Sequence, residues 1–168
     1  MPYTPAISGL SGMSGLNATV LDYLISAAIN NGGFEVAGAP FGSWGETTSG
    51  SSTVTQETAN PHTGLVACSL NIDASSSIAA VTNTGRELLA GVTYQYSLWA
   101  RCPQGVKNLL VKNNNISDGS GNLHALTTEW AKYEGSLTPA STGLFQIKRP
   151  SGQPSVSLVI DDVAVWVA

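Results

Sequence analysis

The chain has 168 residues, of which 42% are hydrophobic and 11% are charged, and its formal net charge at pH 7 is −4. This length suits one domain with an appendage, and the hydrophobic fraction excludes an intrinsically disordered protein. The few basic residues do not cluster, and no apolar run approaches the ~20 residues that span a bilayer, so neither nucleic acid nor a membrane is an expected partner.

Residues 1–16 are rich in proline, glycine and serine with single apolar residues between them, and this pattern predicts an extended arm. Residues 17–29 follow as a predicted short helix, capped by Asn17 or Thr19. Because Asp22 is the one charged residue among the first 34, the helix has no polar face and must be covered, either by its own domain or by a partner. The residues expected to make assembly contacts are Tyr3, Ile7, Leu10, Met13, Leu16, Leu21, Leu24 and Ile25.

From Phe34 onward the pattern is that of an all-β protein. The clearest strand is 94–101, where apolar and polar side chains alternate with the period of two of a half-buried strand. Two segments rich in Gly, Ser, Thr or Asn, 47–52 and 113–122, predict loops. The fold class that follows is an antiparallel two-sheet β-sandwich. The predicted strands are 54–57, 66–72, 78–81, 94–101, 107–112, 130–137, 144–148, 156–160 and 163–167.

The change of pattern near residue 30 divides the chain into an anchoring segment, residues 1–30, and a sandwich domain, residues 31–168. Within the sandwich, Cys68 and Cys102 are too few for a disulfide scaffold. Each is in phase with apolar neighbours on a predicted strand, which favours buried reduced thiols. One disulfide between them is the alternative.

The titratable residues do not form a catalytic constellation. The two histidines lack the spaced partners of a metal or nucleophile motif, so we expect a structural role for His62 in its turn and an exposed His124. The adjacent Asp161 and Asp162 are expected to point to opposite faces of their strand, which does not suit the paired carboxylates of a glycoside hydrolase. The chain is therefore not expected to be an enzyme.

Six short motifs resemble, in order and spacing, the carbohydrate-binding modules of the family 4/9 type. The resemblance extends over residues 30–168 and leaves out residues 1–29. It implies a jelly-roll β-sandwich in which the first and last strands pair. The motifs are Asn31–Glu35, Trp44, His62–Gly64, Leu89–Tyr94 with Ser97–Arg101, Thr128–Trp130 and Ile160–Val163.

The resemblance also implies a structural calcium ion near the paired strands, held by Glu35 and by Asp161 or Asp162. Carboxylates that meet in a chain so poor in charge would repel one another unless a cation or hydrogen bonds relieved them. The alternative is that Glu35 caps a turn while Asp161 and Asp162 accept hydrogen bonds from backbone amides.

Sugar-binding modules stack sugar rings on exposed aromatic side chains and hydrogen-bond them with polar neighbours. The best candidate is Trp99, which shares one strand face with Gln95 and Arg101. Trp130 and Tyr133 come second. The alternative is that these aromatic residues close the ends of the sandwich.

The nearly uncharged N-terminal segment and the lack of a secretion signal favour a component of a larger particle. Jelly-roll domains of this kind occur on tailed-phage virions, so the preferred hypothesis is a non-enzymatic virion accessory protein, namely a capsid decoration protein anchored through residues 1–30. Its expected partners are the major capsid protein or another virion protein, and further copies of itself, for example in a trimer. It would be assembled in the host cytoplasm and reside in the virion. The alternative is a carbohydrate-binding module with a glycan ligand, free-standing or as a phage tail or fibre adhesin.

Overall fold

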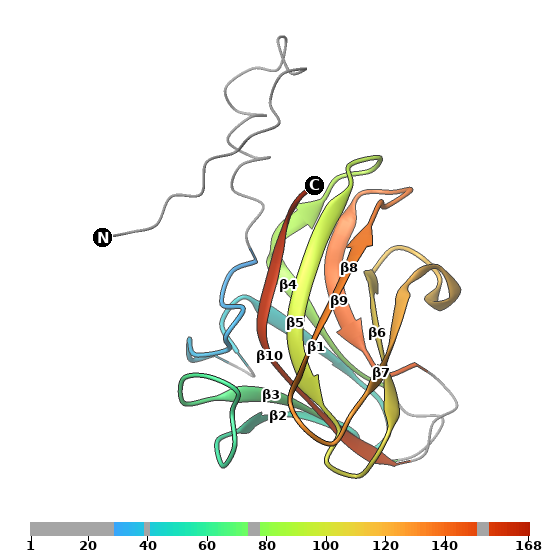
Figure 1. Ribbon diagram of the computed structural model, residues 1–168. Coiled ribbons are helices and arrows are strands. Elements are labelled where there is room, and N and C mark those ends of the chain that lie inside the picture. The colour runs from blue at the N-terminus through green and yellow to red at the C-terminus, as the bar shows by residue number, and fades with distance from the viewer. Residues whose placement is uncertain (1–28, 39–40, 74–77, 151–154) are drawn as a thin grey trace.

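The computed structural model describes residues 29–38, 41–73, 78–150 and 155–168 (Figure 1). The predicted arm, almost all of the predicted helix and all the expected assembly residues lie outside these ranges. Within them, no helix has the length and apolar character that crossing a membrane requires.

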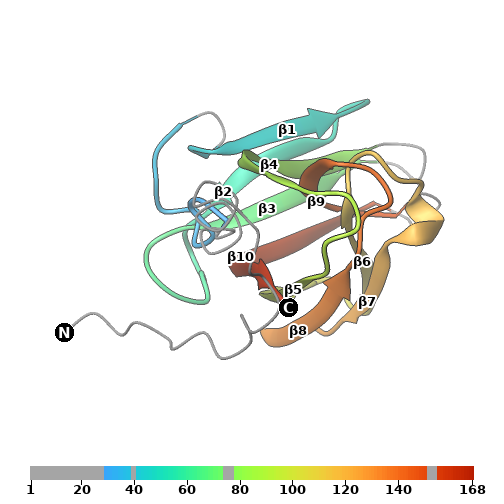
Figure 2. The same cartoon turned by 90° about the horizontal axis from the view of Figure 1, so that it is seen from above.

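The described strands form two five-stranded antiparallel sheets that pack face to face (Figures 1 and 2). Seen from above, β1 and β2 lie at one side of the two layers and β7 and β8 at the other (Figure 2). The all-β jelly-roll sandwich predicted from the sequence is therefore confirmed. Sheet A has the order β1 (Trp44–Thr48), β4 (Ala79–Leu88), β9 (Gly143–Lys148), β6 (Lys107–Asn113) and β7 (Asn122–Leu126). Sheet B has the order β2 (Thr53–Glu57), β3 (Ala67–Ile72), β10 (Val156–Val167), β5 (Tyr94–Arg101) and β8 (Ala131–Leu137). A turn of 3-10 helix, η1 (Asp118–Ser120), lies between β6 and β7.

Strand β5 shows how the sequence pattern becomes the core. Tyr94, Tyr96, Leu98 and Ala100 are each at most 1% exposed and belong to the core between the sheets. The alternate residues of β5 therefore point to the outer face of sheet B, because successive side chains of a strand point to opposite faces. Burial of such apolar side chains holds the sheets together, at roughly 25 cal/mol for each Å² removed from water.

Both cysteines belong to this core. Cys68 and Cys102 are buried and free, so the prediction of reduced thiols is confirmed. Burial raises the pKa of each thiol. The thiolate is therefore disfavoured at neutral pH, and both residues serve packing.

Strands β1 and β7 were not predicted, because each is a short edge strand without a clear alternation of apolar residues. The predicted strands 156–160 and 163–167 form one strand, β10. Its pairing with β5 shifts register between Asp161 and Ala164, where Asp162 adopts a φ of 47°. This bulge explains why the sequence pattern reads as two segments.

The expected pairing of first and last strands is wrong. In the described chain β1 pairs with β4 in sheet A, whereas β10 lies between β3 and β5 in sheet B. The start of the described chain instead reaches β10 through the backbone hydrogen bond from Val163 N to Gly32 O, 2.9 Å long. As the central strand of its sheet, β10 places Asp161 and Asp162 beside neighbours on both sides.

Candidate functional site

The turn Asn31–Glu35 docks against the bulge of β10. A Cβ on Gly32 would lie 1.9 Å from Val163 O, so this approach requires glycine. Asn31 has a φ of 56° and stabilises the turn, because its side chain accepts a hydrogen bond from Val36 N and donates one to Gly42 O. The following Phe34 is buried in the core. These contacts fix the position of the backbone from which the Glu35 side chain extends.

Glu35 reaches the loop that precedes β3. Its Oε1 accepts hydrogen bonds from the backbone N–H groups of Leu65 and Val66, at 2.9 and 3.1 Å. Gly64 adopts a φ of 62°, and a Cβ there would lie 2.1 Å from Glu35 Oε1. Glycine at position 64 therefore lets the loop wrap around this carboxylate. Glu35 thus caps the turn, as the alternative to a calcium ligand predicted.

Asp161 and Asp162 hold the other side of the same loop. Asp161 is fully buried, and its Oδ2 accepts hydrogen bonds from the backbone N–H groups of His62 and Thr63. Asp162 Oδ2 lies 2.7 Å from His62 Nδ1, and its Oδ1 accepts a hydrogen bond from Thr63 Oγ1. The expectation that the two carboxylates point to opposite faces is wrong, because the bulge turns both toward this loop.

Burial raises the pKa of the Asp161 carboxyl to about 6, and the N–H groups that donate to it oppose the rise. The Asp161 carboxylate accepts hydrogen bonds from backbone amides, which is the alternative to calcium that the sequence analysis considered. Within the described ranges, no three His, Cys, Asp or Glu residues are grouped so as to hold a metal ion. Calcium at Glu35, Asp161 and Asp162 stays a prediction, since a bound ion would have to compete with these donors.

His62 also joins the acids to an aromatic cluster, which we define as His62, Trp99, Arg101 and Trp130. The imidazole stacks on Trp99 with ring centroids 3.9 Å apart and an interplanar angle of 17°. Trp130 approaches His62 edge-on at 5.5 Å, and Arg101 Cζ lies 5.2 Å from the centroid of the Trp130 ring. The cluster gathers residues from β5, from the loop before β3 and from the residue before β8.

The structure therefore brings three of the five predicted sugar-binding residues together in this cluster, namely Trp99, Arg101 and Trp130. Trp99, Arg101 and Gln95 alternate with the core residues of β5 and share the outer face of sheet B, as predicted. Tyr133 does not join them. Its ring packs against the core, and its hydroxyl donates to Ala125 O and accepts from Thr127 N.

Trp99 and Trp130 are only partly exposed. His62 covers one face of the Trp99 ring, and Arg101 lies over Trp130, so both indoles already stabilise the loop and strand contacts. Trp130 Nε1 and Arg101 Nε are buried and find no hydrogen-bond partner among the described groups. The cluster thus combines a structural role with two buried donors that have no acceptor among the described groups.

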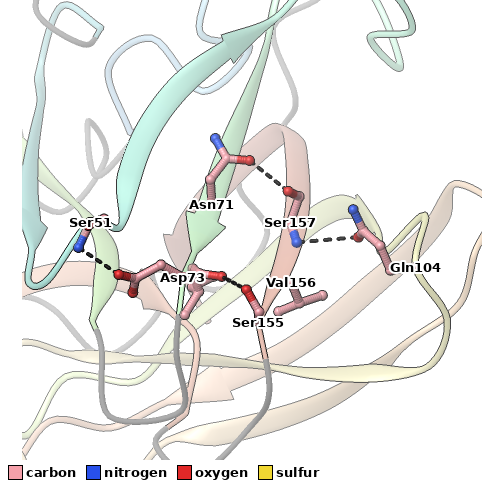
Figure 3. A pocket seen from close by; sticks show the side chains of 8 residues that line it. Ser51, Asn71, Asp73, Gln104, Ser155, Val156 and Ser157 are labelled. Atoms are coloured by element: carbon pink, nitrogen blue, oxygen red, sulfur yellow. Dashed lines mark hydrogen bonds between the residues drawn. The ribbon is translucent and has the colours of Figure 1, made fainter.

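A polar pocket of about 260 Å³ opens at one end of sheet B (Figure 3). It lies where β3 ends and β10 begins, beside the loop that follows β5. The sequence analysis did not single it out, because its residues come from four separate segments. The residues that line it are Ser51, Asn71, Ile72, Asp73, Gln104, Ser155, Val156 and Ser157.

His124 was predicted to be exposed, and this is wrong. It lies on β7, and its Nε2 is 2.6 Å from the hydroxyl of the core residue Tyr96. Burial lowers the pKa of His124 and raises the pKa of Tyr96 to about 12. The contact joins the edge strand β7 of sheet A to β5 of sheet B, a non-local pairing that a local sequence pattern does not reveal.

The chain is thus an antiparallel two-sheet sandwich with a partly exposed aromatic cluster on sheet B. A family described as carbohydrate-binding domain matches residues 26–151. The chain belongs to this carbohydrate-binding domain family, which confirms the resemblance seen in its motifs. No curated protein matches the chain.

Solved structures support the same fold. An arabinose-bound α-L-arabinofuranosidase, MgGH51, superposes with a TM-score of 0.65 at 15% identity over 86% of this chain, which spans only 26% of that enzyme. A TmCBM61 module in complex with β-1,4-galactotriose gives 0.53 at 22% identity, covering 83% of this chain and 97% of the module. Tailspike protein 4 of bacteriophage CBA120, solved as its enzymatically active domain, gives 0.54 at 15% identity and covers 87% of this chain and 22% of the tailspike. At these identities the likeness shows the fold alone.

Proposed function

We propose that the chain binds a glycan without transforming it, on the outer face of sheet B. The observation that supports this proposal is that Trp99, Arg101 and Trp130 gather on one solvent-facing side of a carbohydrate-binding domain. The apolar C–H face of a sugar ring can pack on the part of the indoles that His62 and Arg101 leave open. Polar groups at the rim, including Gln95, then hydrogen-bond the hydroxyls.

The acidic residues support binding without catalysis. Glycoside hydrolysis needs two carboxyl groups on either side of the scissile bond, with enough freedom to donate and accept protons. Asp161 is fully buried, and both it and Asp162 are held by donors from His62 and Thr63. Glu134 lies on β8 beside Lys132, whose Nζ is 2.6 Å from its carboxylate. These acids thus have structural partners in place of a substrate.

A glycan array followed by affinity measurement tests the proposal. Against the retained glycan, Trp99→Ala and Trp130→Ala should each lower affinity about tenfold or more, because each removes stacking area worth over ~1 kcal/mol. Leu123→Ala is the control, since Leu123 is 57% exposed on β7 of sheet A and lies outside the cluster and outside sheet B. The proposed glycan binding would be contradicted if the array retained no glycan, or if all three variants and the wild type bound with equal affinity.

We propose a calcium ion beside Glu35 and Asp162 as a secondary feature, resting on the resemblance and on the proximity of these acids to the same loop. A bound ion would raise the unfolding temperature in millimolar calcium relative to EGTA, and Asp162→Asn would reduce that rise. Equal unfolding temperatures in calcium and in EGTA would contradict the ion.

A second candidate function is that of a virion accessory protein, with residues 1–30 as the anchor to a capsid or other virion protein and to further copies of this chain. The fold shared with a phage tailspike and the nearly uncharged N-terminal segment support it. Removing residues 1–16 should abolish attachment to particles while the sandwich stays folded. Full decoration of particles by the shortened chain would exclude the anchor.

A further inference from the structure

A second exposed indole lies on the outer face of sheet B, outside the aromatic cluster. Trp166 of β10 is 45% exposed and pairs with Gln95 of β5, while its neighbour Val165 belongs to the core. Because side chains alternate along a strand and paired residues share a face, Trp166 points outward with Gln95 and Trp99. Among the described residues, its ring makes no aromatic contact and no hydrogen bond. Its exposed area is therefore free to meet a ligand.

The indoles of Trp166 and Trp99 are separated along the direction of the strands. Gln95, the partner of Trp166, lies four residues before Trp99 on β5, and β5 runs beside β10 (Figures 1 and 2). At the rise of a β-strand this offset is about 13 Å, and the step between neighbouring strands adds about 5 Å sideways. One sugar ring cannot cover both indoles. Because each ring of an extended sugar chain advances about 5 Å, close to the spacing of adjacent strands, a chain of about four rings reaches both.

The surface between the two indoles is made of small or uncharged residues. Ser97 and Ala164 pair with each other midway between the two, and Ala164 is exposed. Ser97 is only 9% exposed, and among the described residues its hydroxyl has no hydrogen-bond partner. Buried hydroxyls are ordinarily hydrogen-bonded, so this one is suited to a ligand hydroxyl. We call Trp166, Gln95, Ser97 and Ala164 the β5–β10 strip.

An ion pair on β8 flanks this strip. Lys132 pairs with Trp99 and Glu134 pairs with Ser97, so both charged side chains share the outer face. Lys132 Nζ lies 2.6 Å from Glu134 Oε1, and the two side chains are 48% and 61% exposed. Their charges compensate each other, while both groups keep capacity for further hydrogen bonds. The surface thus offers stacking area at its two ends and polar groups without net charge between them, which matches the C–H faces and hydroxyls of an uncharged sugar chain.

We propose that the glycan is an extended, uncharged chain of at least about four sugar units that runs parallel to β5 and β10. One ring packs on Trp99 in the aromatic cluster, another packs on Trp166, and the units between them lie over Ser97 and Ala164. This inference rests on the proposed carbohydrate-binding function. It adds Trp166 and Ser97 as contact residues and sets a direction and a minimum length for the ligand. A single terminal sugar would need the cluster alone and would leave Trp166 without a role.

Calorimetric titration with cellohexaose, xylohexaose and their disaccharides tests the β5–β10 strip. At least one hexasaccharide should bind at least tenfold more tightly than its disaccharide, because only the longer chain reaches both indoles. In Trp166→Ala the two lengths should bind alike, at an unchanged unfolding temperature, and Trp166→Phe should restore most of the difference. Ser97→Ala should weaken hexasaccharide binding about threefold. Leu123→Ala, at an exposed position on β7 of sheet A, is the control and should leave it unchanged.

The outcomes separate this inference from the proposed function. Equal binding of both lengths to the wild type, or a loss of hexasaccharide affinity in Trp99→Ala but not in Trp166→Ala, would overturn the role of the strip and leave glycan binding at the cluster standing. A glycan retained on the array while neither hexasaccharide binds would also overturn the strip alone. If no array glycan and no oligosaccharide bound, both the strip and the proposed function would fall.

Discussion

His62 is the residue on which the candidate site depends. It stacks on Trp99 and bonds Asp162 through Nδ1, while its backbone N–H donates to Asp161. The sequence predicts a structural role for His62, but not these partners, because they are far from it along the chain. One side chain thus connects the acids of the β10 bulge to the aromatic cluster.

Replacement His62→Ala should lower the free energy of unfolding by about 2 kcal/mol, since it removes an aromatic stack and a hydrogen bond to a carboxylate. Denaturant unfolding measures the change. Leu65→Ala is the control in the same loop, because Leu65 is 77% exposed and should change stability by less than about 0.5 kcal/mol. Equal losses in both variants would show that His62 does not hold the site together.

The contact between His124 and Tyr96 predicts a pH dependence. Burial lowers the pKa of His124 in the folded chain, so below the ordinary histidine value of 6.5 the unfolded chain binds a proton that the folded chain resists. The stability that wild type has over His124→Gln should therefore fall as the pH falls from 7.5 to 5.5. Unfolding curves of both proteins at the two pH values measure it, and a difference that does not depend on pH would contradict this assignment.

At the scale of elements, the alternation of apolar and polar side chains predicted the strands that bury one face. The segments predicted at 66–72, 94–101 and 144–148 correspond to β3, β5 and β9. The strands β1 and β7 escaped prediction, since each has five residues without a clear alternation of apolar residues. For the aromatic cluster, the sequence could predict only that Trp99 and Arg101 share one face of their strand. The stacking of His62, the turn of both aspartates toward one loop, and the polar pocket depend on strand pairing across the sheet, which no local pattern encodes.

Strand β8 must pass close to β5, and Gly135 allows it. A Cβ on this residue would lie 2.5 Å from the hydroxyl oxygen of Tyr96, which is buried and held by His124. Gly135→Ala should therefore destabilise the fold by about 1–3 kcal/mol through overpacking. Gly119→Ala, at a position where a Cβ meets no atom within 4 Å, is the control. Equal thermal stability of the two variants would contradict this account of the β5–β8 contact.

At the scale of the whole molecule, the two sheets share one core, to which the start of the described chain contributes. Ile29 packs against this core, and Asn30 O accepts a hydrogen bond from Asn83 Nδ2. The Asn31 carbonyl accepts another from Trp44 Nε1. We therefore propose that the self-sufficient domain includes Ile29 and Asn30, which the sequence assigned to the anchoring segment.

Two truncations test this boundary. A chain that lacks residues 1–25 should unfold within about 2 °C of the full chain, whereas one that lacks residues 1–30 should lose about 5 °C or more, because it loses the packing of Ile29 and the hydrogen bond of Asn30. Calorimetry measures both. Equal unfolding temperatures of the two truncated chains would place the boundary later.

The proposed glycan lies on the outer face of sheet B. A chemical-shift map of the labelled chain with its retained glycan tests this position most directly, because it reports every strand at once. We predict that the shifts concentrate on the outward residues of β3, β10 and β5 and on Trp130 before β8. Shifts confined to the outer face of sheet A would contradict this position of the glycan.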